Sequence, residues 1–439
     1  MMRGRISGTL HSLRALKAYR QLPPLAKAEH RHDRAGLPGQ DPGIERAIDE
    51  GIAWLGRAQD HSTSRDGGVA RHYSLITGWG ASYPETTGYI IPTMLEYARW
   101  RGGESGCQVR QRAKRMLDWL VSIQFPEGGF QGGPVGAQPH IPVTFNTGQI
   151  LIGLASGVQE FGQYHEAMYR AADWLVQTQD PDGCWRKHPT PFAAPGEKTY
   201  ETHVAWGLLE AARVAPEKPY AEAALANVRW ALRWQRDNGW LDNCCLSDAS
   251  QPLTHTLGYA LRGFLEAYRF TEDACLLRTI QKTADGLLTA LRENGFLPGC
   301  LRSDWSGTVE WACLTGSVQI AYSWFLLYQY TGELRYYTAA CATNKYVRCT
   351  MKVDGIPETR GAIKGSFPVY GQYGSYQYLN WACKFFVDSN TLESKMAVRS
   401  TRGKAKGPGQ GTPTHISSEG IPDVSSYNAT SRCVRGLGP

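Results

Sequence analysis

The apolar positions in the central part of the chain alternate between two kinds of helical run. Runs such as residues 110–121 have apolar residues on one face and charged residues on the other, as a helix at a protein surface does. Runs such as residues 150–154 and 321–327 are apolar almost throughout, which is typical of buried helices. The alternation predicts amphipathic helices that cover an inner set of apolar helices.

These runs recur with a period of about 57 residues. In four copies a Trp precedes a Gln by five positions, and a turn that contains glycine follows. The turn glycines of the six copies lie 61, 55, 56, 56 and 60 residues apart, at Gly67, Gly128, Gly183, Gly239, Gly295 and Gly355. Hydroxyl residues open the apolar runs and are expected to cap those helices, at Thr86, Thr147, Thr202, Thr256, Thr315 and Ser375.

Six such helical hairpins can close into a ring. We therefore predict an all-α fold, an (α/α)6 toroid with an inner and an outer helix ring, over residues 43–388. Because each hairpin buries its apolar face only against its neighbours, the repeat region is expected to be one domain. The length of 439 residues alone would have suggested two or three domains.

The two ends of the chain differ from the repeat region. Residues 1–42 are expected to form a basic leader, partly disordered or folded as an amphipathic helix through Ile6, Leu10, Leu13 and Leu16. Such a helix would make weak contact with an anionic membrane surface. Residues 389–439, rich in Gly, Pro, Ser, Thr and Lys, predict a disordered tail.

The net charge of +7 belongs to these ends, because residues 1–40 carry +6, residues 389–439 carry +4 and the body carries −3. A mildly acidic body argues against a nucleic-acid partner.

Eleven scattered cysteines without a CxxC motif fit buried free thiols in a reducing compartment. Without a signal-peptide pattern, this predicts a cytoplasmic protein, peripheral at the membrane where the leader binds. No metal ligands are organised in the sequence, so no cofactor and no metal are expected.

One repeat carries a motif that resembles a known family. The residues Arg170, Trp174, Leu175, Gln179, Gly183 and Trp185 are similar to the QW motif of squalene–hopene cyclases. The chain thus resembles the α/α-toroid superfamily of terpene cyclases and protein prenyltransferase β subunits, which implies that Gln and Trp tie an outer helix to the next turn. The DxDD and DDxxD motifs of isoprenoid enzymes are missing, and no Asp completes a prenyltransferase zinc site with Cys313 and His255. The same toroid also hosts glycoside hydrolases, sugar epimerases and uronate polysaccharide lyases.

In such a toroid the residues beside the six caps converge at one mouth. Two carboxylates, two histidines, an amide and several tyrosines are expected there, at Tyr83, Glu85, Asn146, Tyr200, Glu201, His203, His255, Tyr259 and Tyr373. Arg262 shares a helix face with His255 and Tyr259. A polar stripe bonded between helices, and carboxylates favoured near helix N-termini, are the structural alternatives.

The mouth loops add cations and aromatic rings. The cations predict a positive potential that favours an anionic ligand, and they include Arg65, Arg71, His72, Arg186, Lys187, His188, Arg302, Arg360 and Lys364. The rings are candidate stacking platforms for sugars or plain packing, at Trp79, Trp305, Trp311, Tyr370 and Tyr376.

The first hypothesis is a carbohydrate-active enzyme on an acidic, uronate-containing polysaccharide or oligosaccharide, of the lyase, epimerase or hydrolase class, with a role in exopolysaccharide metabolism. Asn146 with Glu85 or Arg262 would hold the carboxylate, His255 or His203 would abstract a proton, and Tyr259 would protonate the leaving oxygen. Glu85 and Glu201 would instead serve hydrolysis if they face each other. The alternatives are a terpene cyclase or prenyltransferase-like enzyme that uses an unfamiliar acid, and a non-catalytic toroid that binds a glycan or a protein.

Overall fold

The computed structural model describes the backbone of residues 19–405 and the side chains of residues 19–398. The chain divides into a unit that ends at Met396 and a second unit that begins at Ala397. The fold described below belongs to the first unit. The amphipathic helix expected through Ile6, Leu10, Leu13 and Leu16 lies outside the described residues, as do residues 406–439 of the expected tail.

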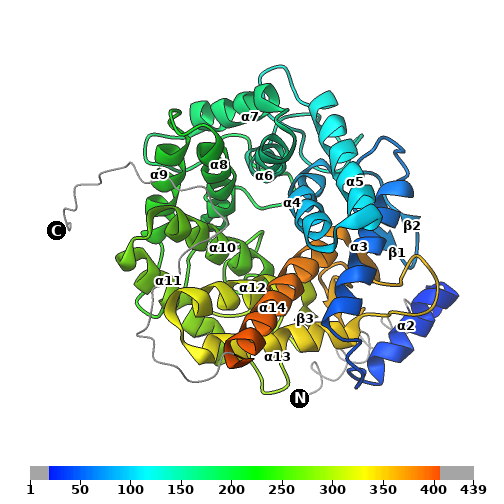
Figure 1. The fold of residues 1–439 in the computed structure, drawn as a ribbon. Coiled ribbons are helices and arrows are strands. Elements are labelled where there is room, and N and C mark those ends of the chain that lie inside the picture. The colour runs from blue at the N-terminus through cyan, green and yellow to red at the C-terminus, as the bar shows by residue number, and fades with distance from the viewer. Residues whose placement is uncertain (1–18, 406–439) are drawn as a thin grey trace, which may run out of the picture. The chain divides into compact units, whose positions relative to one another are not determined.

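Within the described residues, outer and inner helices alternate along the chain from residue 44 onwards. The outer helices are α3 (Ile44–Asp60), α5 (Gly103–Ser122), α7 (His165–Thr178), α9 (Tyr220–Leu232), α11 (Ala274–Ala290) and α13 (Leu334–Thr350). The inner helices are α4 (Pro84–Arg101), α6 (Thr144–Phe161), α8 (Thr202–Val214), α10 (Thr254–Thr271), α12 (Leu314–Thr331) and α14 (Asn380–Ala405). Figure 1 shows the inner helices enclosed by the outer ones, and the predicted all-α toroid is confirmed.

The first and last hairpins join to close the ring. The side chain of Thr93 on α4 donates a hydrogen bond to Asp388 on α14 (2.6 Å), and Asn380 donates to Thr86 (2.8 Å). The loops of the same hairpins pair as antiparallel strands, β1 (His72–Ser74) between β2 (Gly78–Trp79) and β5 (Gln377–Leu379). A second short pair, β3 (Ala312–Cys313) and β4 (Ser366–Phe367), joins the fifth and sixth hairpins.

The repeated glutamines fasten each outer helix to the next one. The side-chain amide of Gln179 donates to the carbonyl of its own turn, Gly183 (3.0 Å), and to Ala223 on the next outer helix (2.9 Å). Gln59 and Gln124 make the same two kinds of bond. Gln235 bonds Thr279 and Thr283 on α11, and Thr283 in turn donates to Gly239. Each copy thus satisfies buried carbonyl groups across a hairpin boundary.

The turn glycines are required by backbone conformation and by close packing. Gly183 has φ +93°, and a Cβ there would lie 2.5 Å from the carbonyl oxygen of Ala226 on α9. In the sixth copy a Cβ added at Gly355 would have nothing within 4 Å. Gly361 packs instead on the next outer helix, where a Cβ would lie 2.0 Å from Glu50 O. The sequence repeat therefore marked the wrong glycine in that copy, because Gly355 keeps the turn conformation but does not contact the next outer helix.

The predicted N-caps are wrong. Helices α4, α6, α8, α10 and α12 begin without a side-chain cap, and most begin before the hydroxyl residue. The hydroxyl of Thr147 instead accepts from Phe130 N (2.9 Å) and donates to Val143 O (2.9 Å). A hydroxyl inside the first turn can bond the carbonyl four residues earlier, so these residues tie the loop to the helix. Ser375 is exposed in the loop before α14.

Part of the expected leader is an integral helix, α2 (Pro24–Arg34). Its buried carboxylates, Glu29 and Asp33, pair with the buried ammonium of Lys364 at 2.6 and 2.5 Å. Asp33 also accepts from Val369 N (2.7 Å). Glu29, His32 and Asp33 are close enough together to hold a metal ion, but Lys364 and Lys352, which also pairs with Glu29, already neutralise the two carboxylates. This cluster therefore fixes α2 on the loop before α14.

The expected boundary of the tail after Asp388 falls inside α14, which continues to Ala405. Polar residues after that boundary are buried, and Glu393 accepts hydrogen bonds from Asn344 (2.8 Å) and Arg348 (2.7 Å) on α13. Asn390 also accepts from Arg348 (2.7 Å). The polar composition of this segment therefore serves a helix interface.

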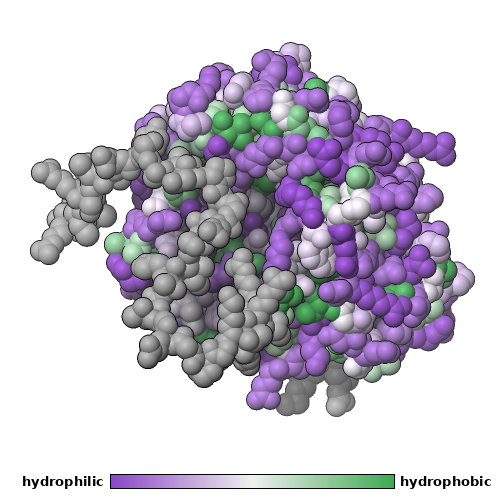
Figure 2. Space-filling view, in the orientation of Figure 1, coloured by the Kyte–Doolittle hydropathy of each residue, from purple (hydrophilic) through white to green (hydrophobic). Residues whose placement is uncertain are grey.

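The surface turned to the viewer in Figure 2 is largely hydrophilic outside the grey residues, and hydrophobic residues form small patches on it. Among the described residues, no helix combines the length and the apolar character that are needed to cross a membrane. The ten cysteines that the structure describes are free.

The contact between a turn and the next outer helix predicts that replacing two glycines of similar conformation destabilises the protein to different extents. Gly183 and Gly355 have φ +93° and +96°, so Gly183→Ala and Gly355→Ala both put a residue with a Cβ in the left-handed region. This lowers the free energy of unfolding by about 1–2 kcal/mol in each variant. Gly183→Ala should lose a further ~1–3 kcal/mol, because its Cβ overlaps α9. Urea denaturation followed by circular dichroism measures both variants, and equal losses of stability would contradict the role given to the turn.

Candidate active site

The inner helices approach one another closely where glycines face a neighbour. A Cβ on Gly88 of α4 would lie 2.4 Å from the Cα of Ile150 on α6, and one on Gly148 would lie 2.6 Å from Val204 on α8. A Cβ on Gly316 of α12 would lie 2.6 Å from His255 N on α10. These contacts bring the first turns of neighbouring inner helices together, with their polar side chains.

Two histidines lie against one tyrosine in this region. The ring centroids of His203 on α8 and His255 on α10 lie 4.4 and 4.3 Å from that of Tyr259. The hydroxyl of Tyr259 lies 3.4 Å from that of Tyr89 on α4. His203 is fully buried and His255 and Tyr259 are nearly so. Residues from three inner helices therefore meet in one cluster.

Each histidine is oriented by a glutamine on an adjacent inner helix. The Nδ1 atom of His203 lies 2.5 Å from Oε1 of Gln149, and that of His255 lies 2.8 Å from Oε1 of Gln319. Because an amide oxygen only accepts, each imidazole carries its proton on Nδ1 and keeps a lone pair on Nε2. Nε2 of His203 is buried without a partner among the described residues.

Both imidazoles are neutral near pH 7. Burial holds the pKa of His203 well below its usual value, and the charges of Arg262 and Lys384 act in the same direction. Burial lowers the pKa of His255 to about 4, against the opposing hydrogen bond of Gln319. The site thus presents two unprotonated nitrogen bases.

Burial also raises the pKa of the two glutamates of the mouth. Burial raises the pKa of Glu85 to about 7, although Tyr83 and Arg71 act to lower it. Burial raises the pKa of Glu201 to about 8, against the charge of Lys198. Neither carboxyl has a cation within ion-pair distance among the described residues.

Several buried polar atoms near these groups have no partner in the part of the chain that the structure describes. They include both side-chain atoms of Asn146, the hydroxyl of Tyr200, one oxygen of Glu201, and the amide nitrogens of Gln149 and Gln319. An unsatisfied buried polar group costs about 1–3 kcal/mol. A ligand rich in hydroxyl groups would satisfy such atoms, which makes this cluster the candidate site.

Aromatic rings pack around the polar cluster. Phe145 on α6 lies between Tyr200 (5.5 Å) and Tyr259 (5.1 Å). Tyr373, on the loop before α14, accepts a hydrogen bond from Trp381 (2.8 Å), and its ring lies 5.4 Å from that of His255. Tyr83 and Trp381 lie under the guanidinium of Arg71, at 5.9 and 5.1 Å.

Arg262 is not free to bind a ligand carboxylate. Its guanidinium lies between the rings of Trp206 (4.1 Å) and Tyr322 (4.3 Å) and donates to Glu266 (2.8 Å). It sits two helical turns after His255, which places it deeper along the inner ring. Its charge still acts on His203, so its role is electrostatic and structural.

The predicted stacking platforms are occupied by protein contacts. Trp305 is buried against Trp240 (5.1 Å) and donates to Asn238 O (3.1 Å). Trp311 is half-buried and packs over Gly299 and Gly371. Tyr370 stacks on His30 of α2 at 4.3 Å, and that histidine bonds the hydroxyl of Tyr376 (2.8 Å).

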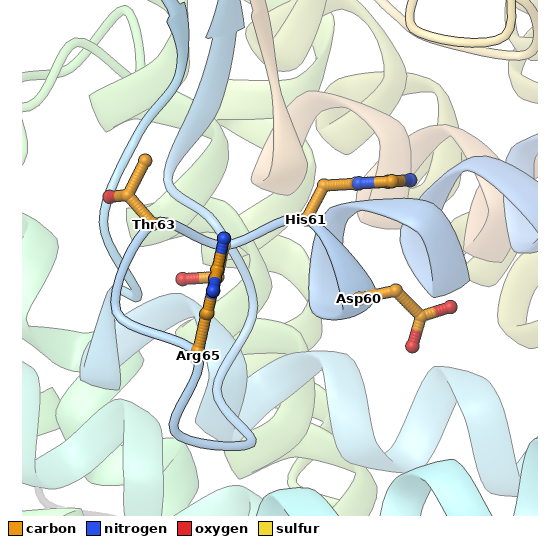
Figure 3. Close-up of a pocket in the computed structure, with 5 residues that line it drawn as sticks. Asp60, His61, Thr63 and Arg65 are labelled. Atoms are coloured by element: carbon orange, nitrogen blue, oxygen red, sulfur yellow. The ribbon is translucent and has the colours of Figure 1, made fainter.

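Trp79 packs against Trp54, Tyr73 and His61. A depression on the surface beside it is lined by Asp60, His61, Ser62, Thr63 and Arg65, from the turn after α3 (Figure 3). None of the predicted catalytic residues lines it.

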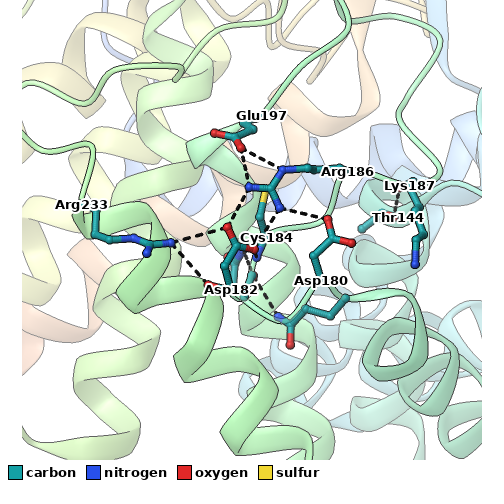
Figure 4. A network of polar contacts seen from close by, with 11 residues as sticks. Thr144, Asp180, Asp182, Cys184, Arg186, Lys187, Glu197 and Arg233 are labelled. Carbon is teal, nitrogen blue, oxygen red and sulfur yellow. Dashed lines mark hydrogen bonds and ion pairs between the residues drawn. The ribbon is translucent and has the colours of Figure 1, made fainter.

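Arg186, predicted as a cation of the mouth, is neutralised by three carboxylates. It donates to Asp180 (3.1 Å), Asp182 (2.7 Å) and Glu197 (2.5 Å), a network that Figure 4 shows. Its charge therefore holds the loop after the third turn and is not available to a ligand.

Sequence reasoning missed four side chains of the inner ring or its edge. Gln149 and Gln319 are single amides in apolar runs, and Lys384 is a buried lysine that pairs with Asp388 (2.5 Å), four positions later. A lone polar residue in an otherwise apolar inner helix was the signal that could have found them. Lys198 gave no such signal, because it lies in a loop rich in proline and glycine.

The pH dependence of the free energy of unfolding should reveal that Glu201 is protonated in the folded state. Its folded pKa of about 8, against 4.5 for the ordinary carboxyl, means that the folded state keeps a proton which the unfolded state loses. This stabilisation, about 5 kcal/mol, is present below pH 4.5 and is lost as pH rises towards 8. Glu201→Gln should flatten the stability profile over that range in urea titrations, whereas the exposed control Glu127→Gln should not. An unchanged slope in Glu201→Gln would contradict the assignment.

No protein-family model matches the sequence, and no curated protein is similar to it at a significant level. Solved structures are similar to it in fold. An unsaturated glucuronyl hydrolase specific for heparin superposes with a TM-score of 0.64 and 13% identity, covering 81% of this chain and 98% of the other. A D-mannose isomerase gives 0.63 and 12%, covering 82% and 100%. The cellobiose 2-epimerase of Bacillus thermoamylovorans gives 0.59 and 11%, covering 79% and 98%. At these identities the likeness establishes the fold of the chain, the α/α toroid.

Proposed function

We propose that this chain is a carbohydrate-active enzyme that transfers a proton at a carbon atom of a uronate-containing saccharide. The observation that carries the proposal is the pair of neutral histidines, His203 and His255, against Tyr259, each with its Nδ1 bound by a glutamine oxygen. A neutral imidazole that is already oriented is a base which needs no further activation at neutral pH.

The chemistry follows from the acidity of the C5 proton of a uronate. One imidazole Nε2 takes that proton, and the electron pair of the C–H bond moves into the adjacent carboxylate. Loss of the oxygen at C4, protonated as it leaves, yields an unsaturated uronate and makes the enzyme a lyase. Return of a proton to the opposite face from a group that carries one, such as the hydroxyl of Tyr259, inverts C5 and makes it an epimerase; the tyrosine then recovers a proton from the imidazolium. Tyr259, whose pKa burial keeps well above its usual value, remains a hydroxyl donor for the leaving oxygen.

Hydrolysis fits this site less well. A pair of catalytic carboxyl groups needs one ionised member and one protonated member. Burial raises the pKa of Glu201 to about 8 and that of Glu85 to about 7, so Glu201 is mostly protonated near neutral pH and Glu85 is ionised only in part, and no described cation forms an ion pair that would hold either one in its ionised form. Their positions suit hydrogen bonding to hydroxyl groups of a sugar.

The isoprenoid alternative meets a similar difficulty. Protonation of an alkene requires a strong acid, whereas pKa values of about 7 and 8 make Glu85 and Glu201 weaker acids than ordinary carboxyl groups. The rings of Phe145, Tyr200 and Tyr259 would suit a carbocation as well as a sugar. The names of the similar structures, a glucuronyl hydrolase, a mannose isomerase and an epimerase, support the sugar substrate.

Proton transfer at carbon can be followed directly in deuterium oxide. Incubation with a panel of acidic polysaccharides should place deuterium at C5, seen by NMR, or create the absorbance of an unsaturated uronate. Of His203→Ala and His255→Ala, the variant that removes the histidine which takes the C5 proton should lose a factor of about 10²–10⁴ in rate, since it lacks the general base. His140→Ala, at an exposed histidine of the mouth loops, should leave the rate unchanged.

Release of reducing ends without deuterium or absorbance would replace this proposal with hydrolysis by the glutamates. Turnover of a polyprenyl substrate, with no response to any saccharide, would favour the isoprenoid alternative. Full activity in both histidine variants would refute the role of the cluster.

A further inference from the structure

Four cationic side chains are buried among the residues that the structure describes, and three of them hold a carboxylate. Arg348 pairs with Asp41 and Glu393, Lys364 with Glu29 and Asp33, and Lys384 with Asp388. The fourth, Lys198, is 7% exposed. Its Nζ donates to the carbonyl of Leu246 at 3.5 Å, and no described carboxylate lies within ion-pair distance.

An uncompensated buried ammonium is costly. Transfer of an isolated charge out of water is unfavourable by several kcal/mol even after relaxation, and buried charges in proteins are normally paired. Glu201, three residues later, does not supply the missing charge, because burial keeps its carboxyl protonated near pH 7 with a pKa of about 8. The protein therefore keeps a positive charge in this place without a negative partner of its own.

The backbone holds Lys198 in this position. The short helix η1 (Thr199–Glu201) directly follows it, and Thr199 bonds the loop between α9 and α10 through Asn243 O (3.3 Å) and Asp242 O (2.9 Å). The neighbouring Tyr200 is buried, and its hydroxyl has no partner among the described residues.

The residues that flank Lys198 in the chain reach the histidine cluster. The ring of Tyr200 packs edge-on against Phe145 at 5.5 Å, and Phe145 packs against Tyr259 at 5.1 Å. The ammonium of Lys198 acts on the carboxyl of Glu201, two residues before His203. The unpaired hydroxyl of Tyr200, the carboxyl of Glu201 and the ammonium of Lys198 therefore belong to one segment that ends at the cluster.

We propose that Lys198 binds the carboxylate of an acidic sugar, with the hydroxyl of Tyr200 as a second donor, and so determines the preference of the site for uronates over neutral sugars. This inference rests on the proposed function and identifies the group that recognises the negative charge of the substrate. A carboxylate supplies the missing negative charge and the acceptors for the free N–H groups of the ammonium. A neutral sugar leaves the charge uncompensated, and a site with unpaired buried polar groups rejects such a ligand.

Lys198 also takes the role that the sequence suggested for other cations. Arg262 is held by Glu266 and two aromatic rings, and Arg186 is neutralised by three carboxylates. Neither has a free charge to offer, whereas Lys198 does.

Calorimetric titration of the full chain with sodium D-glucuronate, sodium D-galacturonate and sodium D-mannuronate, and with the matching neutral sugars, tests the assignment. The wild type should bind one of the uronates at least about tenfold more tightly than its neutral counterpart, a factor worth 1.4 kcal/mol. Lys198→Met should abolish that preference and keep the weak affinity for the neutral sugar. Lys282→Met, at an exposed lysine on the outer helix α11, should bind as the wild type does.

Thermal unfolding of the sugar-free variants gives a second readout. Because Lys198→Met removes an uncompensated buried charge, its melting temperature should equal or exceed that of the wild type. A clear loss of stability would identify Lys198 as a structural cation and overturn the assignment. An unchanged uronate preference in Lys198→Met would also overturn it while leaving the proposed function intact, and failure of the wild type to bind any sugar of a broad panel would remove both.

Discussion

Each outer helix of the ring packs directly on the glycine turn of the hairpin before it, and the rest of the structure depends on this contact. The turn at Gly183 admits no Cβ because the carbonyl of Ala226 occupies that space. Gln179 adds hydrogen bonds to the same turn and to the same neighbouring helix. Repetition of this contact between a turn and the next outer helix sets the angle between successive hairpins. The last such contact, of Gly361 with Glu50, lies on α3 and so joins the last hairpin to the first. Within this ring, glycines such as Gly88 and Gly148 let the first turns of neighbouring inner helices pack closely against one another.

This arrangement lets the fold bury polar groups that a simple core would exclude. Asn146 has no partner for either side-chain atom, and Tyr200 has none for its hydroxyl, among the described residues. Burial of Glu201, whose pKa is raised, and of Lys198, whose charge is unpaired among the described residues, is also unfavourable in free energy. Such groups are unfavourable for the free protein and become favourable when a polar, anionic ligand satisfies them.

The repeat period of the sequence was sufficient to predict the ring, because the spacing of Trp, Gln and Gly reflects the contact that each turn makes with the next outer helix. The same period placed His203, His255 and Tyr259 at one end of the inner helices, where the structure brings them together. It could not identify Gln149 and Gln319 as their partners, since that depends on which face of one helix meets its neighbour. It also misplaced the end of the toroid, because Asn390 and Glu393 look like tail residues until Arg348 on α13 is seen to bind them. Lys198 was overlooked because its burial arises from loop packing, which follows no repeat.

The hydrogen bonds of Gln149 and Gln319 leave His203 and His255 as neutral bases with an unprotonated Nε2, and the proposed chemistry depends on this state. Nitrogen-15 NMR of the histidine side chains in the sugar-free protein measures it, because the two ring nitrogens have different shifts in each tautomer. We expect both residues to be neutral at pH 6 with the proton on Nδ1. We also expect Gln149→Leu and Gln319→Leu each to change the tautomer only of the histidine that the glutamine contacts. An imidazolium at pH 6, or a neutral ring with its proton on Nε2 in either wild-type residue, would exclude these histidines as the bases of the proposed reaction.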